Sequence, residues 1–338
     1  MVRLALIGCC RAGRRYAQVA SRLHNATFVA TVDVDPDTAR RTAEVVGASV
    51  SCGGLDELLT DHGGLVDAVI MARAGGSRQR DCRQAAQAGK HLLVETPLAL
   101  SAGASQDIIT DCADAGVRLM VGQAMRYLPS VRTVKAELDS GRLGKPGLLR
   151  IHRWEPTGDA TGDDPMSDLK QNAGTLHSQP LHEIDLACWL FGCLPTQLHA
   201  VGRRRAEPPT DELDYVQLHL GFPDGGMALI DYWRSLPVGK NYYSLSLIGS
   251  TGAAYADDHH NMQLLYCGGQ PVGLATGQGD NHLCEQLTEF VAAIEENRQP
   301  LITGADGRMA VQVAEAAVES IAAGGAARLT AERYELVA

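Results

Sequence analysis

Short apolar runs alternate with helical patterns through the first third of the chain. Continuous apolar runs are typical of strands buried on both faces, and the segments between them carry apolar residues at helical spacing. Strands are predicted at residues 2–7, 27–33, 48–51, 66–71, 91–94 and 118–121, and helices at residues 11–24, 35–46, 55–61, 78–88 and 104–115. Strands that alternate with helices predict an α/β fold with a doubly wound parallel sheet.

The pattern changes after Gly122. Strands are predicted at residues 147–154, 197–203, 215–222, 227–233 and 242–247, and helices at residues 130–140, 181–191, 282–297 and 305–323. Strands that follow one another without helices predict a largely antiparallel sheet, and the turn Phe222–Gly226 joins two of them as a hairpin. We therefore expect two domains, residues 1–122 and residues 123–338.

The first predicted strand runs directly into a turn with two glycines. Gly8 and Gly13 have the spacing of the first and third glycines of a dinucleotide-binding fingerprint, but Cys10 stands where the middle glycine is expected. Gly8 permits a sharp exit from the strand, and Gly13 lets the next helix lie close to the sheet. With Arg11 and Ala12, the helix N-terminus would offer free N–H groups to a pyrophosphate. Taken alone, the turn is equally compatible with an ordinary strand-to-helix connection.

An acidic residue at the end of the second predicted strand supports the dinucleotide interpretation. Asp33 follows Gly13 by twenty residues, the distance at which a carboxylate accepts hydrogen bonds from the adenosine ribose. Its charge repels the 2'-phosphate of NADP, and Val34 follows where an NADP enzyme would offer arginine. We therefore predict NAD as the cofactor. Cys10 brings a Cβ and a sulfur to the path of the pyrophosphate, so we expect a shifted or weakened pose rather than exclusion.

Composition narrows the class of protein. The chain of 338 residues is 45% hydrophobic and 21% charged, which is typical of soluble globular proteins. No apolar run reaches the length of a membrane span, so we expect no membrane partner. The net charge of −10 argues against a nucleic-acid partner and permits a cationic ligand. Nine cysteines without a C-x-x-C pair, and no signal peptide, favour a cytoplasmic protein.

Five motifs, each weak alone, follow one another along the chain. They are Gly8 to Gly13, AGKHLLVETPLA at residues 88–99, SGRLGKP at residues 140–146, LHEIDL at residues 181–186 and RQPLITG at residues 298–304. Together they resemble the Gfo/Idh/MocA oxidoreductases, the family of glucose–fructose oxidoreductase and inositol dehydrogenase. The resemblance implies an N-terminal Rossmann domain and a C-terminal α/β domain with a large, mostly antiparallel open sheet. It also implies a homodimer or homotetramer formed through that sheet.

The resemblance also implies hydride transfer between a nicotinamide and a carbon of a sugar or cyclitol. Relatives supply a lysine from Glu-Lys-Pro, and an aspartate and a histidine from an Asp-x-x-x-His helix. This chain keeps Glu95 and Pro97 but has Thr96 for the lysine; it keeps His182 but has Ser178 for the aspartate. His182 is thus the base candidate, since imidazole titrates near neutral pH. Ser178 could relay a proton and Thr96 could donate to the substrate oxygen, although packing roles are equally open.

Further cofactor contacts are expected in the loops after the predicted strands at residues 66–71 and 91–94. The resemblance places Glu95 and Thr96 against the nicotinamide ribose, with unusual peptide geometry before Pro97. Ala72 and Arg73 are expected at the cofactor as well. Relatives have Thr-Pro and a later histidine where this chain has Arg73 and Arg78. A solvated surface arginine is the alternative for Arg73.

The expected substrate contacts follow from the same resemblance. Arg126 matches a recurrent family arginine near the active site, which contacts substrate or pairs with a buried acid. His177 and Asp185, close to His182 in sequence, complete the predicted set. The acidic residues between the strand at 147–154 and the helix at 181–191 would favour an ammonium-bearing substrate, although a solvated loop is the simpler interpretation; these are Glu155, Asp159, Asp163, Asp164 and Asp168. His259 and His260 are interpreted as a polar turn, and no metal is expected.

We therefore expect an NAD-dependent dehydrogenase that oxidises a secondary ring hydroxyl to a ketone, or catalyses the reverse, with His182 as acid/base. The substrate would be a sugar, a cyclitol or an amino sugar of the kind met in aminoglycoside biosynthesis. The alternative is a non-catalytic protein that senses NAD or a sugar, because Cys10, Thr96 and Ser178 depart from the family pattern. Opening of a glycosidic bond through transient oxidation by a tightly held NAD uses the same first step.

Overall fold

The computed structural model describes residues 1–73, 77–156, 175–177, 180–204, 213–236, 242–257, 262–266, 272–275 and 281–336. The chain divides into two compact units. The first holds the described residues of Met1–Ala124 and Asp280–Val311, and the second holds those of Met125–Gly162, Ala173–Gly279 and Gln312–Ala338. The predicted domains, residues 1–122 and residues 123–338, stay a prediction.

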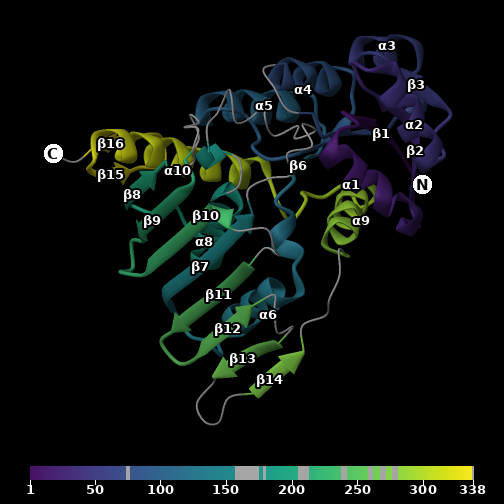
Figure 1. The fold of residues 1–338 in the computed structure, drawn as a ribbon. Helices are drawn as coiled ribbons and strands as arrows, with labels where there is room; N and C mark the ends of the chain where they lie inside the picture. The colour runs from purple at the N-terminus through teal and green to yellow at the C-terminus, as the bar shows by residue number, and fades with distance from the viewer. Residues whose placement is uncertain are drawn as a thin grey trace. The chain divides into compact units, whose positions relative to one another are not determined.

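A parallel sheet of six strands forms the centre of the first unit (Figure 1). Its strands are β1 (Val2–Ile7), β2 (Ala26–Val32), β3 (Val50–Cys52), β4 (Ala68–Met71), β5 (His91–Val94) and β6 (Leu119–Val121). Their order, β3-β2-β1-β4-β5-β6, reverses direction between β1 and β4. Ligands of doubly wound sheets bind beyond the carboxyl ends of the strands at such a switch point. The predicted parallel sheet is confirmed.

Helices cover both faces of this sheet, which is why β4 is buried along its whole length. They are α1 (Arg11–Val19), α2 (Pro36–Val46), α3 (Leu55–Asp61), α4 (Arg78–Gln87), α5 (Ala102–Asp114) and α9 (Asn281–Glu295), with 3-10 turns η1 (Ala20–Arg22) and η2 (Gly63–Leu65). Helix α1 packs on α2 and α9, and α4 packs on α5. Helix α2 begins after Asp35, whose side chain accepts a hydrogen bond from the Asp37 amide (3.2 Å), and ends at Gly47 with φ of +71°.

The second unit contains a sheet of ten strands within the described part of the chain (Figure 1). Their order is β14-β13-β12-β11-β7-β10-β9-β8-β15-β16. The strands are β7 (Pro146–Pro156), β8 (Gln197–Arg203), β9 (Tyr215–Gly221), β10 (Met227–Leu236), β11 (Tyr242–Gly249), β12 (Ala253–Asp257), β13 (Met262–Tyr266), β14 (Val272–Ala275), β15 (Ala326–Leu329) and β16 (Tyr334–Leu336). Neighbouring strands are antiparallel except β7 and β10, which run parallel. The predicted mostly antiparallel sheet is confirmed, whereas β12 to β16 were not predicted.

One face of this sheet is apolar and carries the helix that holds the candidate histidine. Helix α8 (Pro180–Phe191) packs against β7 and β10. Strand residues on the buried face include Leu149, Ile151, Ile230 and Leu245, each at most 2% exposed. The unit also contains α6 (Pro129–Asp139) and the 3-10 turns η3 (Ala124–Tyr127) and η4 (Thr175–His177), and α10 (Gly304–Ala323) begins in the first unit and ends in the second.

Two features are absent from the residues that the structure describes. No helix there is long and apolar enough to cross a membrane. No group of three or more His, Cys, Asp or Glu side chains there could hold a metal ion. His259 and His260 lie outside the described residues.

Candidate functional site

In the turn between β1 and α1, the backbone lies very close to neighbouring atoms at two glycines. Gly8 has φ of +92°, and a Cβ there would lie 2.7 Å from the Arg73 Cβ at the end of β4. A Cβ at Gly13 would lie 2.0 Å from the carbonyl oxygen of Gly8, which is far inside contact distance. Helix α1 can therefore approach β1 this closely only with glycine at position 13.

The N-terminus of α1 is left open to a ligand. Its N-cap residue, Cys10, makes no side-chain cap, and its Sγ lies 3.8 Å from the Ala72 carbonyl oxygen instead. The amides of Arg11 and Ala12 have no hydrogen-bond partner among the described residues, and the first turn contains no acid. Free N–H groups and the positive end of the helix dipole suit a pyrophosphate. The thiol of Cys10 lies toward β4, beside the path that a pyrophosphate would take.

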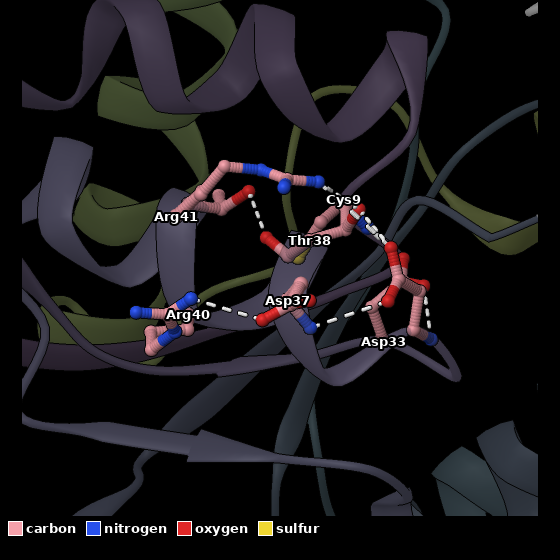
Figure 2. Close-up of polar contacts among 8 residues, drawn as sticks. Cys9, Asp33, Asp37, Thr38, Arg40 and Arg41 are labelled. Atoms are coloured by element: carbon pink, nitrogen blue, oxygen red, sulfur yellow. Dashed lines mark hydrogen bonds and ion pairs between the residues drawn. The ribbon is translucent and has the colours of Figure 1, made fainter.

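Asp33, directly after β2, faces the same turn (Figure 2). Its Oδ2 accepts a hydrogen bond from the Cys9 amide (2.8 Å), and its Oδ1 accepts one from the Asp35 amide (3.0 Å). A carboxylate oxygen accepts about two hydrogen bonds, so both oxygens retain capacity for ribose hydroxyls. Val34 beside it is 76% exposed and offers no positive charge. This donor and acceptor set fits NAD.

The thiol of Cys9 lies under this turn as a neutral group. Burial raises the pKa of Cys9 to about 11, and its Sγ lies 3.7 Å from the Val32 carbonyl oxygen. The thiol is therefore protonated at physiological pH and brings no negative charge to the proposed pyrophosphate position.

The turn after β5 is held by a carboxylate. Glu95 Oε1 accepts a hydrogen bond from the Tyr16 hydroxyl (2.7 Å), and Glu95 Oε2 accepts one from the Thr96 amide (3.0 Å). Tyr16 comes from α1 and is fully buried, and burial raises its pKa well above the ordinary value. The Thr96–Pro97 peptide is cis, at the position where unusual geometry was expected. Gly122 packs so closely that a Cβ there would lie 2.9 Å from Glu95 Oε2.

A buried arginine connects the loops after β4 and β5. Arg78 is 5% exposed and donates to the carbonyl oxygens of Arg73 (2.7 Å from Nη2), Glu95 (3.0 Å from Nη1) and Pro97. Because these partners are neutral carbonyl groups, burial lowers the pKa of its guanidinium. Arg73 is itself ion-paired with the buried Asp81 (3.1 Å). The two loops that carry predicted cofactor contacts are therefore fixed to each other through one side chain.

In the second unit, His182 lies on a partly exposed stripe of α8. Between Pro180 and Leu190 every residue is buried except His182 and Trp189, which are partly exposed. They are seven residues apart and so lie on the same face of the helix. His177, in η4, is buried. Ser178 lies outside the described residues, as do the acidic residues predicted to border the substrate, Glu155 excepted.

Two arginines form buried ion pairs with carboxylates of α8. Arg126 is 5% exposed and binds Asp185 through two hydrogen bonds, Nε to Oδ2 (2.7 Å) and Nη2 to Oδ1 (2.6 Å). Arg153 Nη1 donates to Glu183 Oε1 (3.1 Å) and its Nη2 donates to Glu155 Oε1 (2.7 Å). Burial alone would lower the pKa of Arg153, but Glu183 and Glu155 raise it overall. The Glu155 carboxylate is therefore paired with an arginine that it shares with Glu183.

Sequence reasoning missed Tyr16, Arg153 and Glu183. A signal for Arg153 exists, because the buried face of β7 reads Leu149, Ile151 and then Arg153, a break in apolar alternation that requires a partner. Tyr16 follows Gly13 by three residues on the sheet-facing side of α1, where its hydroxyl also needs a partner. Nothing in the sequence identifies those partners, which lie 30 residues from Arg153 and 79 residues from Tyr16.

We predict that Gly13→Ala lowers NAD affinity about tenfold or more, which corresponds to 1.4 kcal/mol. The new Cβ would push α1 away from Gly8 and displace the first-turn amides. Isothermal titration calorimetry measures this effect. The control is Gly103→Ala in α5, where a Cβ meets only ordinary contacts. Equal NAD affinity in both variants would show that the close approach of α1 is not needed for nucleotide binding.

Two sequence models of a single family match this chain. Residues 2–123 match the oxidoreductase family with an NAD-binding Rossmann fold, and residues 131–255 match the GFO/IDH/MocA C-terminal domain. The motifs noted in the sequence lie within these two regions or, for residues 298–304, after them.

The similarity to known proteins extends over nearly the whole chain. Inositol 2-dehydrogenase of Rhizobium meliloti (strain 1021) is 26% identical over 95% of this chain and 97% of its own length. The scyllo-inositol 2-dehydrogenase (NAD(+)) of Bacillus subtilis (strain 168) is 26% identical over 98% and 97%. A levoglucosan dehydrogenase solved with NADH has the same fold, with a TM-score of 0.86, 20% identity and coverage of 100% and 99%. The chain therefore belongs to the GFO/IDH/MocA family of NAD-binding oxidoreductases.

Proposed function

We propose that this oxidoreductase oxidises a secondary ring hydroxyl of a sugar, a cyclitol or an amino sugar to a ketone with NAD, or catalyses the reverse reaction. The observation that carries the proposal is the placement of His182 on a partly exposed stripe of a helix whose residues are mostly buried. A polar, titratable residue is retained there although nearly every other position of α8 is packed. The names of the two inositol dehydrogenase relatives support a cyclitol as the first substrate class to test.

The first unit holds the nucleotide in this proposal. Gly8, Gly13 and the first-turn amides of α1 would bind the pyrophosphate, and Asp33 would bind the adenosine ribose. The other proposed cofactor contacts are Cys10, Arg11, Ala12, Val34, Ala72, Arg73, Glu95 and Thr96. When bound, NAD supplies the nicotinamide carbon that accepts the hydride.

The second unit supplies the proton acceptor. A carbinol carbon releases hydride only as its hydroxyl proton leaves, so a base must accept that proton. His182 takes it in the oxidative direction and returns it in the reductive direction. Thr96 donates a hydrogen bond to the substrate oxygen, and Ser178 assists proton movement. His177, Arg126 and Asp185 are proposed to border the substrate.

The charge of the site bears on the substrate class. The Glu155 carboxylate is paired with Arg153, so it offers little attraction to an ammonium group. Recognition of an amino sugar would then depend on acidic residues outside the described part of the chain, which are Asp159, Asp163, Asp164 and Asp168. A neutral cyclitol or sugar needs no such charge. A panel of myo-inositol, scyllo-inositol, glucose and glucosamine with NAD, followed at 340 nm, separates these classes. Tight NAD binding without reduction by any of them would favour the non-catalytic alternative.

The solvent-facing side of the ten-stranded sheet is proposed as the surface of a homodimer or homotetramer. It carries two aromatic pairs, Trp154 with Tyr242 (ring centroids 4.9 Å apart) and Tyr215 with Trp233 (5.2 Å). Met227 on the same face is 54% exposed. Burying such half-exposed aromatic residues is typical of subunit interfaces. Light scattering should give a mass of two or four chains, and a single-chain mass that persists at high concentration would contradict this assembly.

We predict that Asp33→Ser raises the affinity for NADP relative to NAD about tenfold or more, because a charge that repels the 2'-phosphate is removed. Dissociation constants for both nucleotides test this prediction. Asp37→Ser is the control, since Asp37 is an exposed carboxylate at the start of α2 that pairs with Arg40 (Figure 2). An unchanged preference in Asp33→Ser would show that Asp33 does not face the adenosine ribose.

We predict that His182→Asn lowers kcat about 100- to 1000-fold, the usual contribution of a positioned acid or base. The KM for NAD should change little, because the nucleotide-binding residues are untouched. In the oxidative direction wild-type kcat should rise with pH as the imidazole loses its proton, and this limb should vanish in the variant. His199→Asn, an exposed histidine on β8, is the control. Undiminished turnover by His182→Asn would refute the assignment.

A further inference from the structure

The two buried carboxylates of α8 lie on either side of His182. At about 100° per residue, Asp185 projects about 60° from His182 in one direction and Glu183 about 100° in the other. His182 thus points outward between two acids that are 1% and 0% exposed. Each acid is held by an arginine from a different element, η3 for Asp185 and β7 for Glu183.

The contact on the Asp185 side is rigid. The two parallel hydrogen bonds from Arg126 fix both the distance and the plane of the carboxylate. The Arg126 guanidinium also lies 5.1 Å from the ring centroid of Trp189, which shares the partly exposed stripe with His182. One arginine therefore holds α8 at two points one helical turn apart.

The contact between Arg153 and Glu183 is supported by residues of the ten-stranded sheet. Arg153 binds Glu155 through both Nε (2.9 Å) and Nη2 (2.7 Å), which leaves Nη1 directed at Glu183 (3.1 Å). The Tyr232 hydroxyl of β10 donates to the second oxygen of Glu155 (3.2 Å). The arginine is thus positioned by two strands before it reaches the helix. Lysine could not make this contact, because it lacks the planar fork of donors.

We propose that Arg126 and Arg153 are positioning residues that fix the rotation of α8 about its own axis and thereby the direction of the His182 imidazole. In addition to the packing of α8 against β7 and β10, two contacts about 160° apart around the axis oppose rotation of the helix about itself. The inference rests on the proposed role of His182 as acid/base. A purely stabilising role for the ion pairs is the competing explanation, and the two differ in what they predict for turnover.

The test compares Arg153→Met, Arg153→Lys and Glu183→Gln with the control Arg142→Met. Arg142 pairs with Glu137 at the end of α6 and touches neither α8 nor β7 in any described contact. We expect Arg153→Met to lower kcat about 30- to 100-fold, the loss typical of a misplaced catalytic group, with KM for substrate changed much less. Arg153→Lys should recover only part of this loss. Glu183→Gln retains an acceptor oxygen, so its loss of kcat should be smaller than that of Arg153→Met. If Arg153→Met fails to fold, Glu183→Gln still tests the proposal.

A second measurement reports on His182 without requiring any catalytic turnover. Labelling of folded protein with diethyl pyrocarbonate, followed by peptide mass spectrometry, gives a reaction rate for His182 that depends on its exposure and direction. Arg153→Met and Glu183→Gln should change this rate while the rate at His199 stays constant, and Arg142→Met should change neither. An unchanged His182 rate, or a kcat loss no larger than in the control, would overturn the positioning role. If His182 reactivity changes but no variant or wild type turns over any polyol, the proposed function fails and the positioning role stands.

Discussion

The nucleotide-binding half of this protein depends on the contact between the first turn of α1 and the end of β1. A side chain at Gly13 would place its Cβ 2.0 Å from a carbonyl oxygen, so the helix sits where only a hydrogen atom fits. This approach brings the free amides of α1 to the carboxyl edge of the sheet, at the point where the strand order reverses. It also brings Tyr16 to Glu95, so that the turn carrying Thr96 is fixed from the same helix.

The second unit buries charged pairs beside His182, the proposed acid/base. Breaking a buried ion pair costs about 3–5 kcal/mol, so the pairs on α8 resist any rearrangement that would separate them. His182 alone of the three charged positions used by relatives is retained, since Thr96 and Ser178 are neutral. In the proposed reaction, the neutral Thr96 would stabilise a developing alkoxide less than a lysine would. The proposed reaction would then depend more on the placement of the His182 imidazole, whose direction we propose to be fixed by Arg126 and Arg153.

The sequence was most informative where local rules decide the structure. Helix α2 was placed from Asp35 and Pro36 at its start, and both sheets followed from the spacing of apolar runs. Strands β12 to β16 were missed because they are short and their apolar residues form no long alternating run. The first unit also holds residues of Asp280–Val311, which come after most of the second unit in sequence. Periodicity cannot show such a return of the chain.

The candidate site was predictable only in part for the same reason. Glycine spacing and the acid after β2 identified the nucleotide half, because each of these features has a local backbone function. The sequence offered pairing with a buried acid as one option for Arg126, but it did not identify Asp185 as that acid or Glu183 as a partner of Arg153, since these pairings join distant segments. The acidic stretch that contains Glu155 had two interpretations, a substrate border or a solvated loop, and the sequence did not indicate that Glu155 pairs with Arg153.

The most direct test of the account is to follow a labelled hydrogen. The best substrate of the polyol panel, carrying deuterium at the carbinol carbon that is oxidised, is incubated with the enzyme and NAD. Mass spectrometry of the reduced nucleotide should find the deuterium on its nicotinamide ring, because the carbon-bound hydrogen moves as hydride while the hydroxyl proton leaves through His182. Recovery of the deuterium in water, or a nucleotide that stays oxidised while the polyol binds, would contradict the account.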